Sequence, residues 1–347
     1  MVKIFYLFIL LLVFILLWNR FKILDDSALR NKNKEKKICG ITMVAPSKAF
    51  TKDPVPEIKE TGSNWIALIP YAFTSHGKAE VRYNENKWQW WGEQPEGIRE
   101  SIRLAKAQGL KIMLKPQVYI HRGWVGNLDF HSEKEWIMWE EQYKRYLMIF
   151  VQIAIDEHVE MICIGTEIYL SATKRATFWI ELIADIRKVY HGKLTFSANW
   201  DHYRNIPFWN QLDYIGISAY FPLLEDKQPE KDKLMNAWKP YTVEMKEFSK
   251  NLHKKILFTE FGYLCVDGCA GKTWELEMNI ASHPINQTAQ ATSLDALLET
   301  FMKETFWAGG FLWKWFPNMD GHEGYPERDY TPQGKAAEFI LKKWYSK

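Results

Sequence analysis

The sequence predicts an α/β fold: a closed (β/α)8 TIM barrel with an N-terminal membrane anchor or signal segment. From Ile38 to the C-terminus, apolar strand-like runs alternate with helical stretches, and eight strand candidates occur. Such alternation is typical of a parallel sheet, and eight units favour a closed barrel. Two of the runs end directly on a glutamate, Glu167 or Glu260. Because the active sites of these barrels lie at the carboxyl ends of the strands, both are candidate catalytic acids.

Residues 1–24 form the predicted anchor or signal segment. Ile4–Trp18 is an unbroken apolar run between basic residues. Extended to Leu24, a helix over this run is long enough to span a hydrocarbon core about 30 Å thick. A cleaved signal peptide is the alternative, but no small-x-small cleavage site follows the run at the right place. We expect a membrane-anchored or exported protein whose catalytic domain lies outside the cytoplasm.

Residues 25–37 form a predicted tether, because this polar, charge-dense stretch has too few apolar residues to fold by itself. The positive charge of this tether favours a cytoplasmic location for the domain that follows it, since basic flanks of membrane helices usually stay in the cytoplasm. This conflicts with the expected location outside the cytoplasm, and the sequence leaves the orientation open. Residues 38–347 form the predicted barrel domain, which we expect to be monomeric.

The predicted barrel strands share a short length and an apolar composition. In order, they are Ile38–Val44, Asn64–Pro70, Lys111–Val118, Met161–Glu167, Leu194–Asn199, Tyr214–Tyr220, Lys255–Glu260 and Gly309–Trp315. The helical stretches include Glu96–Gln108, Glu133–Glu157, Lys174–Tyr190, Lys231–Leu252, Thr288–Phe306 and Pro332–Trp344. Strand alternation predicts that Phe258 and Glu260 share one face, and that Gly165 points inward if Glu167 does.

Composition points to an uncharged ligand. The 45 basic and 42 acidic residues nearly balance, and no basic stripe lies outside the N-terminal tail, so nothing indicates a nucleic-acid partner. Aromatic residues make up 15% of the chain and include 17 tryptophans, more than a core requires. Flat rings with polar edges are the surfaces on which sugar faces stack. We therefore expect an oligo- or polysaccharide substrate.

Several other chemistries lack a residue basis. No GxGxxG, P-loop, HExxH or Gly-x-Ser-x-Gly motif occurs, and metal-ligand clusters are absent from the sequence, so no cofactor or metal is predicted. Cys163 lies in a strand and is expected to be a buried filler. Cys265 and Cys269 flank a probable turn, and we favour a disulfide between them over a metal pair, which lacks partner ligands.

A family resemblance emerges from motifs that each stand at the end of their own strand. They are WWGE at 90–93, LKP at 114–116, IGTE at 164–167, SANW at 197–200, SAY at 218–220, TEFG at 259–262 and FLWKW at 311–315. With these motifs the sequence resembles glycoside hydrolase family 113, which comprises (β/α)8 retaining enzymes and includes β-mannanases. The resemblance extends through most of the chain from Ile38 onward.

The resemblance implies roles for the two glutamates: Glu167 as the general acid/base and Glu260 as the nucleophile of a retaining β-glycosidase acting on β-1,4-mannan or manno-oligosaccharides. The nucleophile must be ionised while the acid/base holds a proton, and the charge of Glu260 is expected to raise the pKa of Glu167. Alternatives are another β-linked hexose polymer, or a non-catalytic glycan-binding barrel that would be expected to have lost one glutamate. The sequence leaves open whether the enzyme cuts within the polysaccharide chain or from one of its ends.

Further residues are candidates for substrate binding around these acids. Tyr220 is placed to donate a hydrogen bond to Glu260, as in related barrels, and Asn199 is a candidate for a sugar hydroxyl or a carboxylate. Thr166 stands where many relatives have Asn before the acid/base, which places the usual 2-hydroxyl contact in doubt. Strand alternation predicts that Trp315 lies nearer the mouth than Trp313. The remaining candidates are Lys115, for which a snorkelling position at the rim is the alternative, Gln117, Trp91, Glu93, Trp124 and Trp200.

Overall fold

The computed structural model describes residues 36–83, 88–121, 123–318 and 326–347. The chain divides into two units, Met1–Lys37 and Ile38–Lys347. The predicted anchor, residues 1–24, and nearly all of the predicted tether lie outside the described residues. Among the helices within the described ranges, none is long and apolar enough to cross a lipid bilayer.

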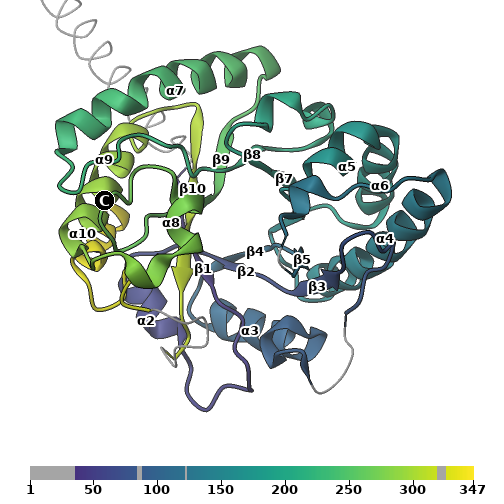
Figure 1. Cartoon of the computed structure of the whole chain (residues 1–347). Helices are drawn as coiled ribbons and strands as arrows, with labels where there is room; N and C mark the ends of the chain where they lie inside the picture. Colours follow the sequence, from purple (N-terminus) through teal and green to yellow (C-terminus); the bar gives the residue numbers. More distant parts are fainter. Residues whose placement is uncertain (1–35, 84–87, 122, 319–325) are drawn as a thin grey trace, which may run out of the picture. The chain divides into compact units, whose positions relative to one another are not determined.

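Eight parallel strands close into a barrel, which confirms this part of the fold prediction (Figure 1). Around the barrel they are β1 (Ile38–Met43), β2 (Trp65–Leu68), β4 (Lys111–Leu114), β6 (Met161–Thr166), β7 (Lys193–Asn199), β8 (Ile215–Ser218), β9 (Ile256–Phe261) and β10 (Trp307–Trp315). Each strand pairs in parallel with the next one along this order, and β10 pairs with β1.

The predicted strand Lys111–Val118 is divided in the structure. β4 ends at Leu114, and β5 (Gln117–Ile120) begins after Pro116. Proline has no backbone N–H to donate, so it interrupts a strand ladder. Beyond it, β5 pairs in parallel with β3 (Tyr71–Thr74), which follows β2, in a separate two-stranded sheet. This break separates Lys115 from Gln117 while keeping both at the carboxyl end of β4.

Helices alternate with the strands and surround the barrel (Figure 1). They are α2 (Val55–Glu60), α3 (Pro95–Ala107), α4 (Glu133–Asp156), α5 (Tyr169–Lys174), α6 (Ala176–Val189), α7 (Lys231–Leu252), α8 (Thr273–Met278), α9 (Gln287–Phe301) and α10 (Ala336–Tyr345). Short 3₁₀ turns are η2 (Trp91–Glu93), η3 (Val125–Asn127), η4 (Tyr203–Asn205), η5 (Trp209–Gln211) and η6 (Ile280–Ser282). The sequence does not predict α2, α5 or α8.

The long helix α4 shows how the helices are fixed to the barrel. It begins with a capping box: Ser132 Oγ accepts from the N–H of Glu135 at 3.3 Å, and Glu135 Oε2 accepts from the N–H of Ser132 at 3.0 Å. On its buried face, Tyr143 Oη donates to the carbonyl of Ile164 at 2.7 Å. Since Ile164 belongs to β6, the helix holds the strand that leads to Glu167.

Apolar side chains form an inner and an outer layer. The cluster inside the barrel comprises Ile38, Ala67, Met113, Met161, Cys163, Leu257, Ala308 and Phe311. The outer layer fills the space between strands and helices, and its largest fully buried side chains include Trp139, Trp179, Trp238 and Trp307. As expected, Cys163 is a buried filler, and burial raises the pKa of its thiol to about 11.

Irregular pairing reverses two of the faces that alternation predicts. A Cβ atom on Gly165 would meet Phe196 and Trp179 of the outer layer, so Gly165 does not face inward. Phe258 also faces outward, with its ring 4.8 Å from that of Phe301 on α9. The ladders of β6 and β9 shift register shortly before the two glutamates, and such bulges re-aim the side chains that follow.

The predicted disulfide between Cys265 and Cys269 is wrong, because both thiols are free and buried. The N–H of Cys265 donates to the carbonyl of Arg328 at 2.8 Å, which fixes its backbone against a distant segment. Cys269 Sγ lies 3.7 Å from Ser293 Oγ on α9. Neither cysteine side chain is therefore covalently bound to the other.

Candidate active site

Three side chains donate hydrogen bonds to the carboxylate of Glu260, near the end of β9. Lys115 Nζ and Gln117 Nε2 both contact Oε1, the latter at 3.3 Å, and Tyr220 Oη donates to Oε2 at 2.9 Å. These donors come from the carboxyl ends of β4 and β8 and from the start of β5. Only 6% of Glu260 is exposed. The cation and the two neutral donors compensate the burial of this carboxylate and hold both of its oxygens in place.

Lys115 is a buried cation rather than a snorkelling residue. Its side chain has 0% exposure, so its ammonium group depends on protein partners. One partner is Glu260, and another is the ring of Trp313, whose centroid lies 5.1 Å from Nζ. Lys115 thus links the carboxylate to an aromatic surface on β10.

Glu167 follows β6 with an unusual backbone conformation. Its φ is +57°, which non-glycine residues rarely adopt. Hydrogen bonds hold the residue on both sides: its N–H donates to the carbonyl of Ser197 at 2.7 Å, and its carbonyl accepts from the N–H of Tyr169 at 2.8 Å. Trp124 Nε1 donates to the carboxyl Oε2 at 2.9 Å. Such an outlier at a strand end is typical of functional sites.

The two glutamates influence each other electrostatically. Burial raises the pKa of Glu167 to about 7, and the negative charge of Glu260 acts in the same direction. Hydrogen bonds from Trp124 and Ser218 and the charge of Lys115 oppose this shift. A carboxyl group with a pKa of about 7 can hold a proton near neutral pH, so Glu167 is suited to act as an acid.

A ladder of hydroxyl groups lies next to Glu167. Ser197 Oγ lies 2.5 Å from Thr259 Oγ1 and 2.9 Å from Ser218 Oγ, and Ser218 in turn hydrogen-bonds Glu167. The three hydroxyls come from β7, β8 and β9. In the sequence, the signal for this ladder is a short hydroxyl-bearing residue near the end of each of three neighbouring strands.

Asn199 is the last residue of β7, and Trp200 follows it. Asn199 Nδ2 donates to Asp201 at 2.9 Å, so the contact that the structure shows is with a loop acid. The ring of Trp200 stacks on Trp274 of α8 at 5.9 Å and 14°. Trp274 is 40% exposed, and the sequence analysis did not single it out. The pair offers an accessible aromatic surface next to the barrel mouth.

Trp313, not Trp315, is the β10 tryptophan near Glu260. Trp315 is 3% exposed and belongs to the outer apolar layer. The prediction fails because the pairing of β10 with β1 skips a residue: Thr42 is opposite Trp313 and Met43 is opposite Trp315. This irregularity breaks the alternation that was used to rank the two rings.

Trp91 and Glu93 lie on η2, and the charge of Glu93 acts on Tyr146 of α4. Trp91 Nε1 donates to Glu100 of α3 at 2.9 Å, which directs its polar edge toward a surface helix. Glu93 is 9% exposed.

The predicted residues that the structure brings together are Glu167, Glu260, Lys115, Gln117, Tyr220, Trp124 and Trp313. Among the described residues, no group of three His, Cys, Asp or Glu side chains is arranged to hold a metal ion.

Comparisons with known proteins agree with the barrel fold. Residues 46–335 match the family model described as Glycoside Hydrolase Family 113. Two structures, of a GH113 β-1,4-mannanase and of a complex of such an enzyme, share 27% and 26% identity, each with a TM-score of 0.75 and coverage of 89% of this chain and 99% of theirs. The GH113 β-mannanase AaManA from Alicyclobacillus acidocaldarius, in complex with ManMIm, has 24% identity, the same TM-score, and coverage of 90% and 98%. No curated protein matches the sequence.

Proposed function

Because the chain belongs to glycoside hydrolase family 113 and is therefore a glycoside hydrolase, we propose that it hydrolyses β-1,4-mannan or manno-oligosaccharides with retention of configuration. The substrate rests on the β-1,4-mannanases at 26% and 27% identity. The mechanism rests on the unequal environments of the two glutamates. This difference is the observation that carries the proposal.

The first chemical step needs an ionised nucleophile and a protonated acid. Glu260, held by Lys115, Gln117 and Tyr220, attacks the anomeric carbon and forms a covalent glycosyl ester, while the bond to the leaving oxygen breaks. Glu167 transfers its proton to that oxygen. A pKa of about 7 suits this task, because the acid keeps its proton near neutral pH and still gives it up readily.

The second step reverses the role of Glu167. Once Glu260 is esterified, its negative charge is gone, and one of the causes that raise the pKa of Glu167 disappears with it. Glu167 then acts as the base that takes a proton from water, and the water oxygen attacks the anomeric carbon. The ester bond to Glu260 breaks, and the product sugar keeps its β configuration.

The substrate is tested by a hydrolysis screen over mannan, glucomannan, xylan and cellulose oligosaccharides, with the products sized. We expect turnover of mannan or manno-oligosaccharides and, by NMR, initial release of the β-anomer. Hydrolysis of cellulose or xylan oligosaccharides alone would favour another β-linked polymer. Initial release of the α-anomer would contradict the double displacement.

A further inference from the structure

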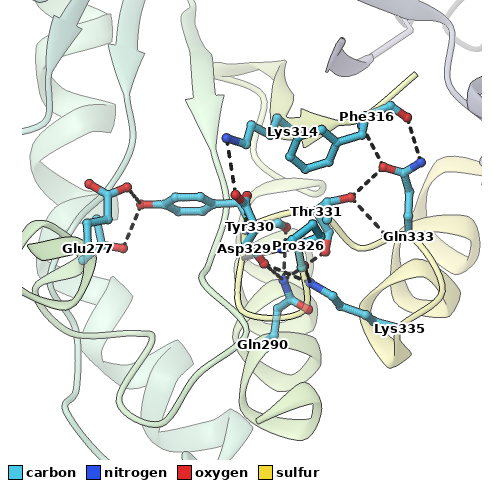
Figure 2. Close-up of polar contacts among 11 residues, drawn as sticks. Glu277, Gln290, Lys314, Phe316, Pro326, Asp329, Tyr330, Thr331, Gln333 and Lys335 are labelled. Carbon is cyan, nitrogen blue, oxygen red and sulfur yellow. Dashed lines mark hydrogen bonds and ion pairs between the residues drawn. The ribbon is translucent and has the colours of Figure 1, made fainter. Parts of the chain in front are cut away.

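The short helix α8 lies between β9 and α9 in the chain. Two of its residues bind the same phenol group. Tyr330 Oη donates to Glu277 Oε1 at 2.7 Å (Figure 2). The same hydroxyl lies 3.0 Å from Thr273 Oγ1. Tyr330 belongs to the segment after β10, so this contact joins two connections on the mouth side of the barrel.

This contact is continuous with the environment of the nucleophile. The ring of Tyr330 lies 5.7 Å from that of Tyr220, at an interplanar angle of 58°, and Tyr220 Oη donates to Glu260. Although Glu277 is exposed as a residue, partial burial of its carboxyl group raises its pKa; the hydrogen bond from Tyr330 and the charge of Lys314 oppose this shift, and the charges of Asp329 and Glu260 add to it. Glu277 therefore lies within the electrostatic reach of Glu260.

The segment that carries Tyr330 is held firmly. Gln290 Nε2 of α9 donates to the carbonyls of Tyr263 and Tyr330, each at 3.0 Å. Lys335 Nζ donates to the carbonyls of Pro326 at 2.8 Å and Asp329 at 3.0 Å (Figure 2). With its backbone fixed in this way, Tyr330 presents its hydroxyl to Glu277 in a defined position, and preorganised groups of this kind are what ligand sites require.

The contacts of Glu277 leave part of its carboxylate for a ligand. Tyr330 occupies Oε1, and no other described residue hydrogen-bonds Oε2. Glu277 as a residue is exposed, so a ligand in the mouth can reach it. We propose that Glu277 is a substrate-binding residue that accepts a hydrogen bond from a hydroxyl group of the sugar ring bound beside Glu260, and that Tyr330 positions it.

The inference rests on the proposed function for the identity of that sugar. A carboxylate is a strong acceptor for hydroxyl groups, and its charge roughly doubles the strength of such a bond. The competing explanation is that Glu277 only braces Tyr330. Glu277→Gln separates the two, because an amide oxygen still accepts from Tyr330 but lacks the charge. Glu275→Gln is the matched control, since Glu275 lies on the same helix and pairs with Lys272 at 3.2 Å.

The experiment measures kcat/KM of the wild type, Glu277→Gln and Glu275→Gln on an activated aryl β-mannoside and on each of its monodeoxy analogues. We expect Glu277→Gln to lower kcat/KM on the parent substrate about tenfold to hundredfold, or about 1.4–2.8 kcal/mol. On one deoxy analogue, the kcat/KM values of Glu277→Gln and the wild type should differ by less than about threefold, because this analogue lacks the hydroxyl that Glu277 binds. Glu275→Gln should match the wild type throughout.

An equal loss of kcat/KM for Glu277→Gln on the parent substrate and on every analogue would overturn the proposal. It would show that Glu277 only holds Tyr330 in place. Ratios taken within one preparation do not depend on the fraction of folded protein, so a less stable variant is still informative. A wild type that does not act on β-mannosides would contradict the proposed function instead. The deoxy analogues are then made from the aryl β-glycoside that the enzyme does hydrolyse. A smaller effect of Glu277→Gln on one of these analogues than on the parent substrate tests Glu277 independently of the proposed substrate.

Discussion

Lys115 and Glu260 form a buried ion pair between the ends of β4 and β9: the lysine side chain has 0% exposure and its ammonium group contacts Oε1 of the glutamate. Removing one partner of such a pair leaves an uncompensated charge, which is far more unfavourable than never burying the pair. The pair also fixes one oxygen of the proposed nucleophile, while Tyr220 binds the other.

Lys115→Met should therefore lose both activity and stability. Methionine keeps the length of the side chain without its charge, so the Glu260 carboxylate loses its cation. We expect kcat to fall at least a hundredfold and the free energy of unfolding to fall by about 3 kcal/mol or more. Steady-state kinetics and urea unfolding measure the two effects, and Gln117→Ala, which removes a neutral donor, should be milder in both. Unchanged kcat in Lys115→Met would contradict a role for the pair.

The raised pKa of Glu167 predicts the pH dependence of catalysis. Because the acid must be protonated, kcat/KM should decline as the pH rises through about 7. The same group affects stability. Between pH 4.5, the ordinary pKa of this carboxyl group, and about pH 7, Glu167 keeps its proton in the folded protein but loses it in the unfolded chain. Its contribution to the free energy of unfolding therefore falls as the pH rises across that window.

NMR titration of Glu167 tests the cause of the shift. In Glu260→Gln the pKa of Glu167 should fall, since the neighbouring charge is removed, but it should stay above its ordinary value because the carboxyl group is still buried. An unaltered pKa in Glu260→Gln would show that the two glutamates do not interact.

The barrel was predictable because its signal is local. Each strand is an apolar run, and Glu167 and Glu260 are conspicuous as charges at the ends of such runs. Side-chain direction was less predictable, since Gly165, Phe258 and Trp315 all depend on register shifts between neighbouring strands. A single sequence shows the alternation of a strand but not the residue at which its partner skips.

The outer parts of the site were missed for a related reason. Glu277 and Tyr330 are 53 residues apart in sequence and meet through one hydrogen bond. The segment around Tyr330 is fixed by Gln290, whose amide reaches backbone carbonyls that carry no sequence signal. Contacts of this kind are specified by the tertiary fold, so composition and periodicity do not reveal them.

Deleting the chain up to Lys37 should leave a soluble and active enzyme. This cut falls before β1, in which all six residues are buried, so it removes the predicted anchor and tether without touching the barrel. A second deletion that ends at Met43 is the control and should unfold the domain, because β1 pairs with both β2 and β10. Circular dichroism and activity measure the outcome, and an unfolded product from the first deletion would contradict the tether prediction.

Azide rescue distinguishes the two glutamates by stereochemistry. Glu260→Ala should abolish turnover, because the covalent ester cannot form, whereas Glu167→Ala should still form it from a substrate with a dinitrophenolate leaving group, which departs without a proton. The ester then accumulates, since no base activates water, and added azide should attack it from the β face and give the β-glycosyl azide. In Glu260→Ala, azide instead occupies the space of the missing carboxylate and should give the α-glycosyl azide. Product anomers assigned by NMR would fix both roles, and normal activity in either variant would reject the assignment.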